Sequence, residues 1–460
     1  MAIPEHELLL PSLVDGMPIA SALLSNDTDS LAKIIRSFLP NSSSAQVTDV
    51  IIKKSLGEAF TGGRSTPVYE VSCQVYRQPP GQCRQRHFVA KLILMPSNID
   101  DGKIEADEES VNHRLWVKRE SYRVERQFYD CAAPRLGAQQ FMGIPALPVP
   151  KLLASDRDGS RPWSAVCFFM NDLRHGGFPC HPDFLSPEQT KRALRWLASF
   201  HARFWGEAKI TSSSSSWRRH LWERGGFWTV KRRNGDLNSS QRVKVSGMAQ
   251  QWTQTIRFLE SKHPAVITSH TKALGKRLEA AARPIAEFLT RQSQSANGTL
   301  IHGDFKAANM FLSITGDDDD DDIHGGGDIS SVAVLDFQFA GLGLAAEDVA
   351  YFLFPDARGH YFDREPKLLK VYYDEFISQL ILQQKGGPST LSIEAFRGYY
   401  ELSRIDFIRY WLEKGWVAST DGDAKLVTAL EATMFKLDGG RERSEMEYAK
   451  AAAKLTNAKG

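Results

Sequence analysis

The sequence predicts an α+β protein in which a small β-rich N-terminal part precedes a larger, mainly helical part. The chain has 460 residues, and 42% of them are hydrophobic, which is enough to bury a sizeable core in two or three domains. Apolar residues alternate with polar ones at 68–76 and recur at 87–94, as they do in half-buried strands. Beyond residue 186 the apolar spacing becomes that of amphipathic helices.

The β-rich part is predicted at residues 46–173, after an N-terminal lead-in at residues 1–45. Its first two strands are separated by Pro79-Pro80-Gly81, which is typical of a hairpin turn. Helical periodicity follows at 122–131. A proline-rich connection then leads to a second pair of strands, which ends at Asn171-Asp172-Leu173.

The helical part is predicted at residues 174–460 and begins with a clear start signal. Ser186 is a good N-cap residue, and Pro187 suits the first helical position. Further helices are expected at 246–262, 271–292, 366–384 and 392–416. The run of aspartates from Asp317 to Asp322 is expected to be a solvated hairpin tip, because a block of like charges repels itself.

Composition excludes several classes of protein. The 57 basic and 55 acidic residues leave a net charge of +2, so no global charge favours nucleic acid as a partner. The five cysteines form no C-x-x-C pair, which argues against a zinc site or a disulfide framework and for a reduced, cytoplasmic protein. The N-terminus lacks the basic region of a signal peptide, and no apolar run is long enough for membrane insertion. Nothing in the sequence predicts an oligomeric state.

The segment Leu300–Met310 contains the pattern H-x-D-x-x-x-x-N, formed by His302, Asp304 and Asn309. A second aspartate, Asp336, directly follows the apolar stretch 332–335. Phosphoryl-transfer enzymes of the kinase type use such a set as one base and two Mg²⁺ ligands. Asp304 is therefore the candidate catalytic base, and Asn309 and Asp336 are the candidate metal ligands. Chance would give the first pattern in roughly a few per cent of chains of this length, and a strand-borne aspartate downstream favours function further.

Three other residues are expected to support this loop, and a fourth is expected to be structural. Lys306 is the second catalytic candidate, since a cation two residues after the base can neutralise the transferring phosphoryl group; the alternative is a solvated lysine. His302 is expected to brace the loop. Asp348 is expected to cap a helix or hold the loop through its backbone, and His201 to be a satisfied core residue.

A lysine and a glutamate are candidates for binding nucleotide phosphates. Lys91 lies within an apolar strand pattern, so it either faces solvent at a sheet edge or is paired in a site. Glu125, in the helical stretch at 122–131, is the expected partner, with Glu120 as a rival. The pair would hold the α- and β-phosphates of ATP.

A glycine-rich stretch at 56–65 precedes the first of these strands. Gly62, Gly63 and Ser65 are candidate contacts for phosphate, because glycines let backbone N–H groups approach an anion closely. Any glycine-rich hairpin has a similar composition. The assignment as a phosphate contact therefore rests on the position of the stretch before the strand that contains Lys91.

Taken together, the motifs resemble the aminoglycoside phosphotransferase and choline-kinase-like superfamily, and most of all its ecdysteroid-kinase-like (CHK-type) branch. The resemblance covers roughly residues 50–420 and rests on these segments: Glu125–Tyr129, Leu197–Ala202, His302–Asp304 with Asn309, Asp336–Gln338 and Asp348–Phe352. It implies a bilobal protein-kinase-like fold that uses ATP and Mg²⁺ to phosphorylate a hydroxyl group of a small molecule. It also implies nucleotide contacts at Met170 and Asn171, where Asn171-Asp172-Leu173 replaces the commoner Glu-Asp-Leu.

Two alternatives to a small-molecule kinase remain open. A protein Ser/Thr kinase has an Arg where this chain has Gly303 and a Gly where it has Gln338, although Lys306 does match the D-x-K of that class. The short span from Asp336 to Asp348 also leaves no room for a long peptide-docking segment. A non-catalytic nucleotide-binding pseudokinase predicts the loss of a candidate catalytic group, and all of them are present.

The sequence leaves the acceptor open among an amino alcohol, a sterol, a sugar and an aminoglycoside-like compound. Aromatic residues in the C-terminal helices, together with one carboxylate, could enclose a cation or stack on a ring system. Helix-spaced aromatics are more often part of a core. The residues in question are Tyr399, Tyr400, Asp406, Trp411 and Trp416.

Overall fold

The computed structural model contains two compact units that are interleaved in sequence. It describes residues 19–39, 45–55, 68–77, 82–94, 108–137, 147–157, 165–207, 221–229, 247–315, 328–354, 364–387 and 390–456. Unit 1 comprises Met1–Ala133, Pro148–Asp183 and Ala308–Leu335. Unit 2 comprises Pro134–Leu147, Phe184–Ala307 and Asp336–Gly460.

Unit 1 is built on a five-stranded antiparallel sheet with the strand order β1-β2-β3-β5-β4. The strands are β1 (Ala45–Ser55), β2 (Val68–Arg77), β3 (Gln82–Leu94), β4 (Leu152–Arg157) and β5 (Ala165–Asn171). The strands expected at 68–76 and 87–94 are confirmed as β2 and β3. Their expected turn at 79–81 lies outside the described residues.

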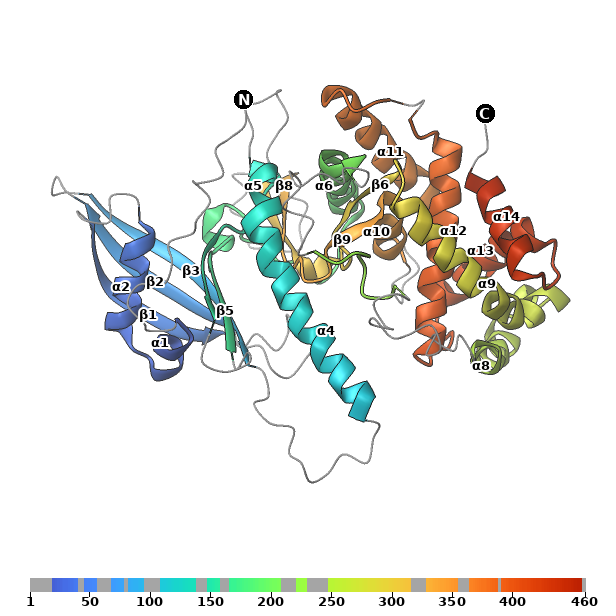
Figure 1. Ribbon diagram of the computed structural model, residues 1–460, viewed down its shortest axis with the longest axis horizontal. Coiled ribbons are helices and arrows are strands. Elements are labelled where there is room, and N and C mark those ends of the chain that lie inside the picture. Colours follow the sequence, from blue (N-terminus) through green and yellow to red (C-terminus); the bar gives the residue numbers. More distant parts are fainter. Residues whose placement is uncertain are drawn as a thin grey trace. The chain divides into compact units, whose positions relative to one another are not determined.

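Two short helices, α1 (Ile19–Ser25) and α2 (Thr28–Phe38), pack beside this sheet (Figure 1). Asp27 caps α2 by accepting a hydrogen bond from the Ser30 N–H. Leu31 and Ile35 of α2 are fully buried in one cluster with Val71 of β2. This part of the N-terminal lead-in therefore contributes to the core of unit 1.

A long helix follows the sheet in unit 1. The helix expected at 122–131 begins earlier, as α4 (Glu108–Gln127), and its end widens into a π-turn, η2 (Phe128–Ala132), followed by α5 (Ala133–Gly137). A separate two-stranded antiparallel ladder pairs β7 (Met310–Thr315) with β8 (Asp328–Val334). The aspartate run lies between these two strands, outside the described residues.

Unit 2 is mainly helical. Helix α6 (Pro187–Phe204) begins where the sequence predicts, since Ser186 accepts a hydrogen bond from the Gln189 N–H and completes a capping box. The other helices are α8 (Met248–Lys262), α9 (Ser269–Ser293), α10 (Ala345–Phe352), α11 (Glu365–Leu382), α12 (Ile393–Glu413), α13 (Asp421–Asp438) and α14 (Glu445–Thr456). The α+β prediction is thus confirmed, with an antiparallel β-rich N-terminal region and a mostly helical remainder.

A short ladder in unit 2 joins the two segments that carry the catalytic motifs. Strand β6 (Gly298–Ile301) ends just before Asp304 and pairs antiparallel with β9 (Gly341–Leu344), which follows Asp336. Across the described ranges, no helix is both long and apolar enough to cross a bilayer.

Candidate functional site

The candidate base, Asp304, lies in the loop after β6 and is buried, with 4% of its surface exposed. Its Oδ1 accepts a hydrogen bond from the Tyr351 hydroxyl at 2.7 Å, and its Oδ2 accepts one from Lys306 Nζ at 2.9 Å. Each carboxylate oxygen therefore has a donor of its own. Since each oxygen carries two lone pairs, the carboxylate can still accept a further proton donor.

Three hydrogen bonds hold the backbone of this loop. The Asp348 carboxylate accepts the His302 N–H at 2.6 Å and the Gly303 N–H at 2.9 Å. The Asp304 N–H donates to His302 Nδ1 at 3.2 Å. The structure thus confirms that Asp348 holds the loop through its backbone and that His302 braces it.

His201, on α6, supports Asp348 from behind. It is fully buried between the Tyr372 hydroxyl, 2.6 Å from its Nδ1, and the Asp348 carboxylate, 3.2 Å from its Nε2. Burial lowers the pKa of His201, although Asp348 acts in the opposite direction. The prediction that His201 is a satisfied core residue is confirmed.

Gly303 has a backbone conformation that the loop requires. Its φ of +78° lies in the left-handed region, where a side chain is strained. A Cβ there would also clash with the carbonyl oxygen of Phe339 and the backbone nitrogen of Gly226. The loop therefore has no room for a side chain at residue 303.

We expect Gly303→Ala to reduce the free energy of unfolding by at least about 2 kcal/mol, with left-handed strain and overpacking each contributing about 1 kcal/mol or more. Gly206→Ala is the matched control, because Gly206 has nearly the same φ, +77°, and a Cβ added there would meet no atom within 4 Å. It should lose only the strain of about 1 kcal/mol. Urea unfolding measures both, and equal losses would show that close packing around Gly303 is unimportant.

Burial raises the pKa of Asp304, and the charge of Asp336 raises it further, whereas Lys306 and the Tyr351 hydrogen bond lower it. A carboxyl whose pKa is raised is a stronger base when deprotonated, as a general base must be. Because the charge of Asp336 raises the pKa of Asp304, the two carboxylates interact electrostatically.

Asp336 is one of four non-glycine residues with positive φ in the described part of the chain, at +69°. Such conformations are sparse outside glycine and concentrate at functional sites. The residue is 9% exposed, and Gln338 Nε2 donates to its Oδ2 at 3.4 Å.

Asn309, the other candidate metal ligand, belongs to unit 1. It ends the short 3₁₀-turn η7 (Ala307–Asn309) and is 1% exposed. Its backbone carbonyl accepts the Leu335 N–H at 3.1 Å, which ties the start of β7 to the residue before Asp336.

Lys91 and Glu125 form an ion pair within unit 1. Lys91 Nζ lies 3.0 Å from Glu125 Oε1 and 2.9 Å from Oε2, with 12% and 1% of the two side chains exposed. Lys91 is on β3, the central strand of the sheet, so it is not a solvent-facing edge residue. Glu120 instead binds Arg123, which settles the choice of partner in favour of Glu125.

The remaining nucleotide candidates are placed only in part. Met170 lies within β5, is 8% exposed, and its backbone pairs with β3 and β4. Asn171 ends that strand, and its Oδ1 accepts the Lys151 N–H at 2.5 Å. Gly62, Gly63 and Ser65 lie outside the described residues.

The segment 221–229 packs on the loop that carries Asp304, a contact that was not predicted from the sequence. The Phe227 N–H donates to the Gly303 carbonyl, and the Gly226 N–H donates to the Phe339 carbonyl. Trp222 forms a parallel bridge to Gly341 of β9. The only local signal is a Gly-Gly pair followed by two aromatics, which does not indicate a partner.

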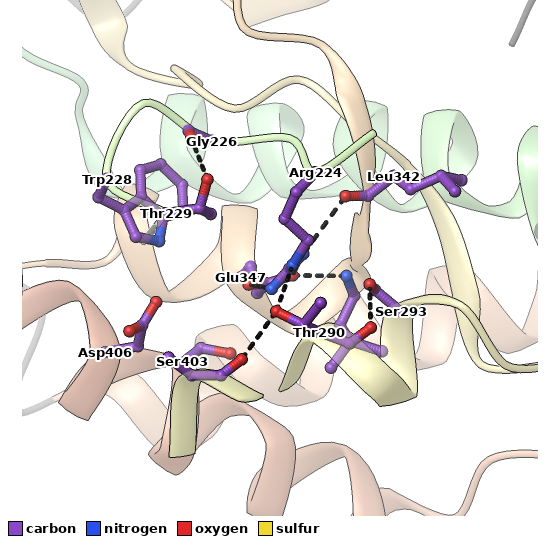
Figure 2. Close-up of polar contacts among 12 residues, drawn as sticks. Arg224, Gly226, Trp228, Thr229, Thr290, Ser293, Leu342, Glu347, Ser403 and Asp406 are labelled. Atoms are coloured by element: carbon purple, nitrogen blue, oxygen red, sulfur yellow. Dashed lines mark hydrogen bonds and ion pairs between the residues drawn. The ribbon is translucent and has the colours of Figure 1, made fainter. Parts of the chain in front are cut away.

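A buried ion pair attaches this segment to α10. Arg224 Nη1 donates to Glu347 Oε2 at 2.7 Å and to the Leu342 carbonyl at 3.3 Å, and both charged side chains are almost fully buried (Figure 2). Glu347 also accepts the Leu344 N–H at 2.7 Å, which caps the start of α10. The helix that carries Asp348 and Tyr351 is therefore fixed to the 221–229 segment.

Three of the five C-terminal candidates for a cation box lie in the core, whereas Trp411 is exposed. Tyr399 and Tyr400 are core residues, 4% and 1% exposed, with hydroxyls bound to Gln292 and Glu365 respectively. Asp406 is buried in an ion pair with Arg409. The helical spacing of Tyr399 and Tyr400 therefore reflects packing.

Similarity to solved structures is distant. An aminopropanol kinase associated with a microcompartment is 13% identical with a TM-score of 0.38, over 89% of this chain and 95% of its own. An amicoumacin kinase is 11% identical with a TM-score of 0.35, over 82% and 87%. A macrolide 2'-phosphotransferase from Brachybacterium faecium is 11% identical with a TM-score of 0.26, over 95% and 99%.

Among curated proteins, none matches the sequence. The family model of the ecdysteroid kinase-like family, by contrast, matches residues 103–384. This range contains Glu125, the Asp304 loop, Asp336 and α10, and it is more than half of the chain. The protein belongs to the ecdysteroid kinase-like family.

Proposed function

We propose that the protein is an ATP- and Mg²⁺-dependent phosphotransferase that phosphorylates a hydroxyl group of a small molecule. The observation that carries the proposal is the buried Asp304 carboxylate, which accepts hydrogen bonds from Tyr351 and Lys306 in a loop that Asp348 holds by its backbone. Family membership supports the reaction class.

In this proposal Asp304 accepts the proton of the attacking hydroxyl. A base must be deprotonated to act, so turnover should fall as the pH drops through the raised pKa of Asp304. Lys306 Nζ, on the other carboxylate oxygen, is proposed to neutralise charge on the transferring phosphoryl group. Its side chain is 46% exposed, so it can leave Asp304 for a phosphate oxygen at little cost.

The donor groups suit Mg²⁺ bound together with a nucleotide. Mg²⁺ takes oxygen ligands and is usually held by one or two carboxylates plus substrate phosphates and water. Asp336 is the proposed carboxylate ligand and Asn309 the proposed amide ligand. When bound, the ion would neutralise charge on the phosphates.

On unit 1, the Lys91–Glu125 pair is proposed to bind the α- and β-phosphates of ATP. Glu125 is nearly inaccessible and fixes the lysine, whose side chain retains some exposure. Backbone groups at Gly62, Gly63 and Ser65 are proposed as further phosphate contacts, and Met170 and Asn171 as contacts to the rest of the nucleotide.

We expect Lys91→Met to weaken MgATP binding by about 10-fold or more, because a hydrogen bond to a charged group contributes about 1.5–3 kcal/mol. Lys53→Met on β1 is the matched control, since that lysine is exposed on the same sheet. Titration calorimetry with MgATP gives both affinities. An unchanged dissociation constant for Lys91→Met would contradict the phosphate role.

The acceptor can be identified by measuring ATP turnover in the presence of candidate compounds. Purified protein is incubated with MgATP and, in turn, an ecdysteroid, an amino alcohol, a sterol, a sugar and an aminoglycoside, while ADP release is followed. We expect at least one of these small alcohols to stimulate ADP release.

Two other outcomes would favour the alternatives. Phosphorylation of peptides without any small-molecule turnover would favour a protein Ser/Thr kinase. Absence of turnover with every acceptor, combined with normal nucleotide binding, would favour a pseudokinase. A cytoplasmic location is proposed from the sequence alone, since its five cysteines form no C-x-x-C pair and imply no disulfide framework.

A further inference from the structure

Tyr351 is the residue beside the base to which no role has yet been assigned. We propose that it is the positioning residue for the reaction: its hydroxyl fixes the orientation of the Asp304 carboxylate for proton transfer. This inference rests on the proposed function. Its geometric basis is the 2.7 Å hydrogen bond from the Tyr351 hydroxyl to Asp304 Oδ1.

One helix face holds both the backbone and the side chain of the base. Asp348 and Tyr351 are three residues apart on α10, so they lie on the same side of the helix. Asp348 binds the N–H groups of His302 and Gly303, and Tyr351 binds the carboxylate of Asp304. The position of α10 therefore sets the loop and its base together.

The ring of Tyr351 is held on several sides by other aromatic rings. Its centroid lies 5.5 Å from that of Phe227, 5.3 Å from that of Trp228 and 5.1 Å from that of Phe407. Phe227 and Trp228 belong to the 221–229 segment, and Phe407 belongs to α12. With its ring packed between two chain segments, the tyrosine presents its hydroxyl in one direction only.

The supporting rings are themselves attached to the protein by buried charges. Arg409 of α12 donates from Nη2 to the Trp228 carbonyl at 2.8 Å. The Arg224–Glu347 pair ties the same segment to α10, where Figure 2 shows the two side chains facing each other. The aromatic rings around Tyr351 are therefore held by contacts of the 221–229 segment with both α10 and α12.

The hydroxyl of Tyr351 acts as a donor and not as a second base. Burial raises its pKa well above the ordinary value, and the neighbouring Asp304 charge raises it further, so the phenol keeps its proton. Lys306, the other donor on the carboxylate, is exposed, whereas Tyr351 is only partly so. Of the two hydrogen bonds to the Asp304 carboxylate, the one from Tyr351 is therefore the more rigid.

The test is Tyr351→Phe, which removes the hydroxyl and keeps the ring. The probes are MgATP hydrolysis with water as the acceptor and transfer to the first alcohol of the panel that gives turnover. We expect kcat to fall by about 10- to 100-fold, the loss that a small misplacement of a reacting group produces, while KM for MgATP and for the alcohol stays within about 2-fold.

The acidic limb of the pH profile gives a second readout. The charged and titratable groups with the largest effects on the pKa of Asp304 are Lys306, Asp336 and Tyr351. The Tyr351 hydrogen bond lowers the pKa of Asp304, so its removal should shift the acidic limb to higher pH. Tyr373→Phe is the control: that buried hydroxyl donates to the Leu391 carbonyl, and its loss should change neither readout.

Each outcome decides the assignment. The assignment is overturned if Tyr351→Phe has wild-type kcat and an unshifted acidic limb. It is also overturned if the fall in kcat comes with a rise in KM or with loss of cooperative unfolding, because these changes would indicate a purely structural role. Failure of the proposed function looks different, because the wild-type protein would then turn over no acceptor and Asp304→Asn would change nothing.

Discussion

Replacing Asp304 by asparagine should reduce turnover by about 10³-fold while MgATP affinity stays within about 2-fold. The asparagine keeps the size of the side chain and can still accept the Tyr351 hydrogen bond, but it cannot take up the proton of the attacking hydroxyl. Burial keeps water from substituting easily for the carboxylate, since only 4% of the residue is exposed. Steady-state kinetics and calorimetric titration measure the two quantities.

The control for this change is Asp374→Asn, in an exposed ion pair with Lys370 on α11, which should leave turnover unchanged. The contrast within the site is Asp336→Asn, which should weaken nucleotide binding in the presence of Mg²⁺ because a metal ligand is lost. If Asp304→Asn and Asp336→Asn reduced nucleotide affinity equally, the separate roles of base and metal ligand would be wrong.

Replacing Arg224 by methionine should reduce the free energy of unfolding by about 3–5 kcal/mol, because it removes one partner of a buried ion pair. Arg224 and Glu347 are 4% and 0% exposed at their side chains. Burial raises the pKa of Glu347 even beside Arg224, and without the arginine the rise would be larger. The carboxyl would then be buried unpaired or take up a proton, and the 221–229 segment would lose its attachment to α10.

Two variants serve as controls for the measurement of Arg224→Met by urea unfolding. Lys370→Met breaks an exposed ion pair, whose side chains are 64% and 56% exposed, and should change stability by less than about 1 kcal/mol. The double variant Arg224→Met with Glu347→Leu should recover much of the loss, since apolar residues can replace a buried pair. A loss below about 1 kcal/mol in Arg224→Met would show that the pair does not hold the segment.

The parts of the site that could be predicted from the sequence are those encoded within one short segment. His302, Asp304 and Asn309 lie at fixed offsets in one loop, and Asp336 follows an apolar strand, so residue type and spacing were sufficient to name them as candidates. The helical context of Glu125 also identified the partner of Lys91 that the structure shows. In the fold, alternation predicted β2 and β3, and capping residues predicted the start of α6.

What could not be predicted depends on contacts between distant segments. Arg224 and Glu347 are 123 residues apart, and Tyr351 and Asp304 are 47 apart, and neither pair belongs to a shared periodic pattern. For the same reason, helical spacing could not tell whether Tyr399 and Tyr400 lie in a core or line a site. Periodicity identifies the buried face of an element, but only the tertiary fold decides what that face meets.

The central claim is that Asp304 serves as the base for phosphoryl transfer to a small alcohol. Its most direct test is to incubate the protein with ATP labelled at the γ-phosphate, Mg²⁺ and the alcohol that best stimulates ADP release, and to isolate the product. The account predicts a labelled phosphate ester with the wild-type protein and none with Asp304→Asn. Absence of an ester with the wild-type protein, or equal amounts from both proteins, would contradict it.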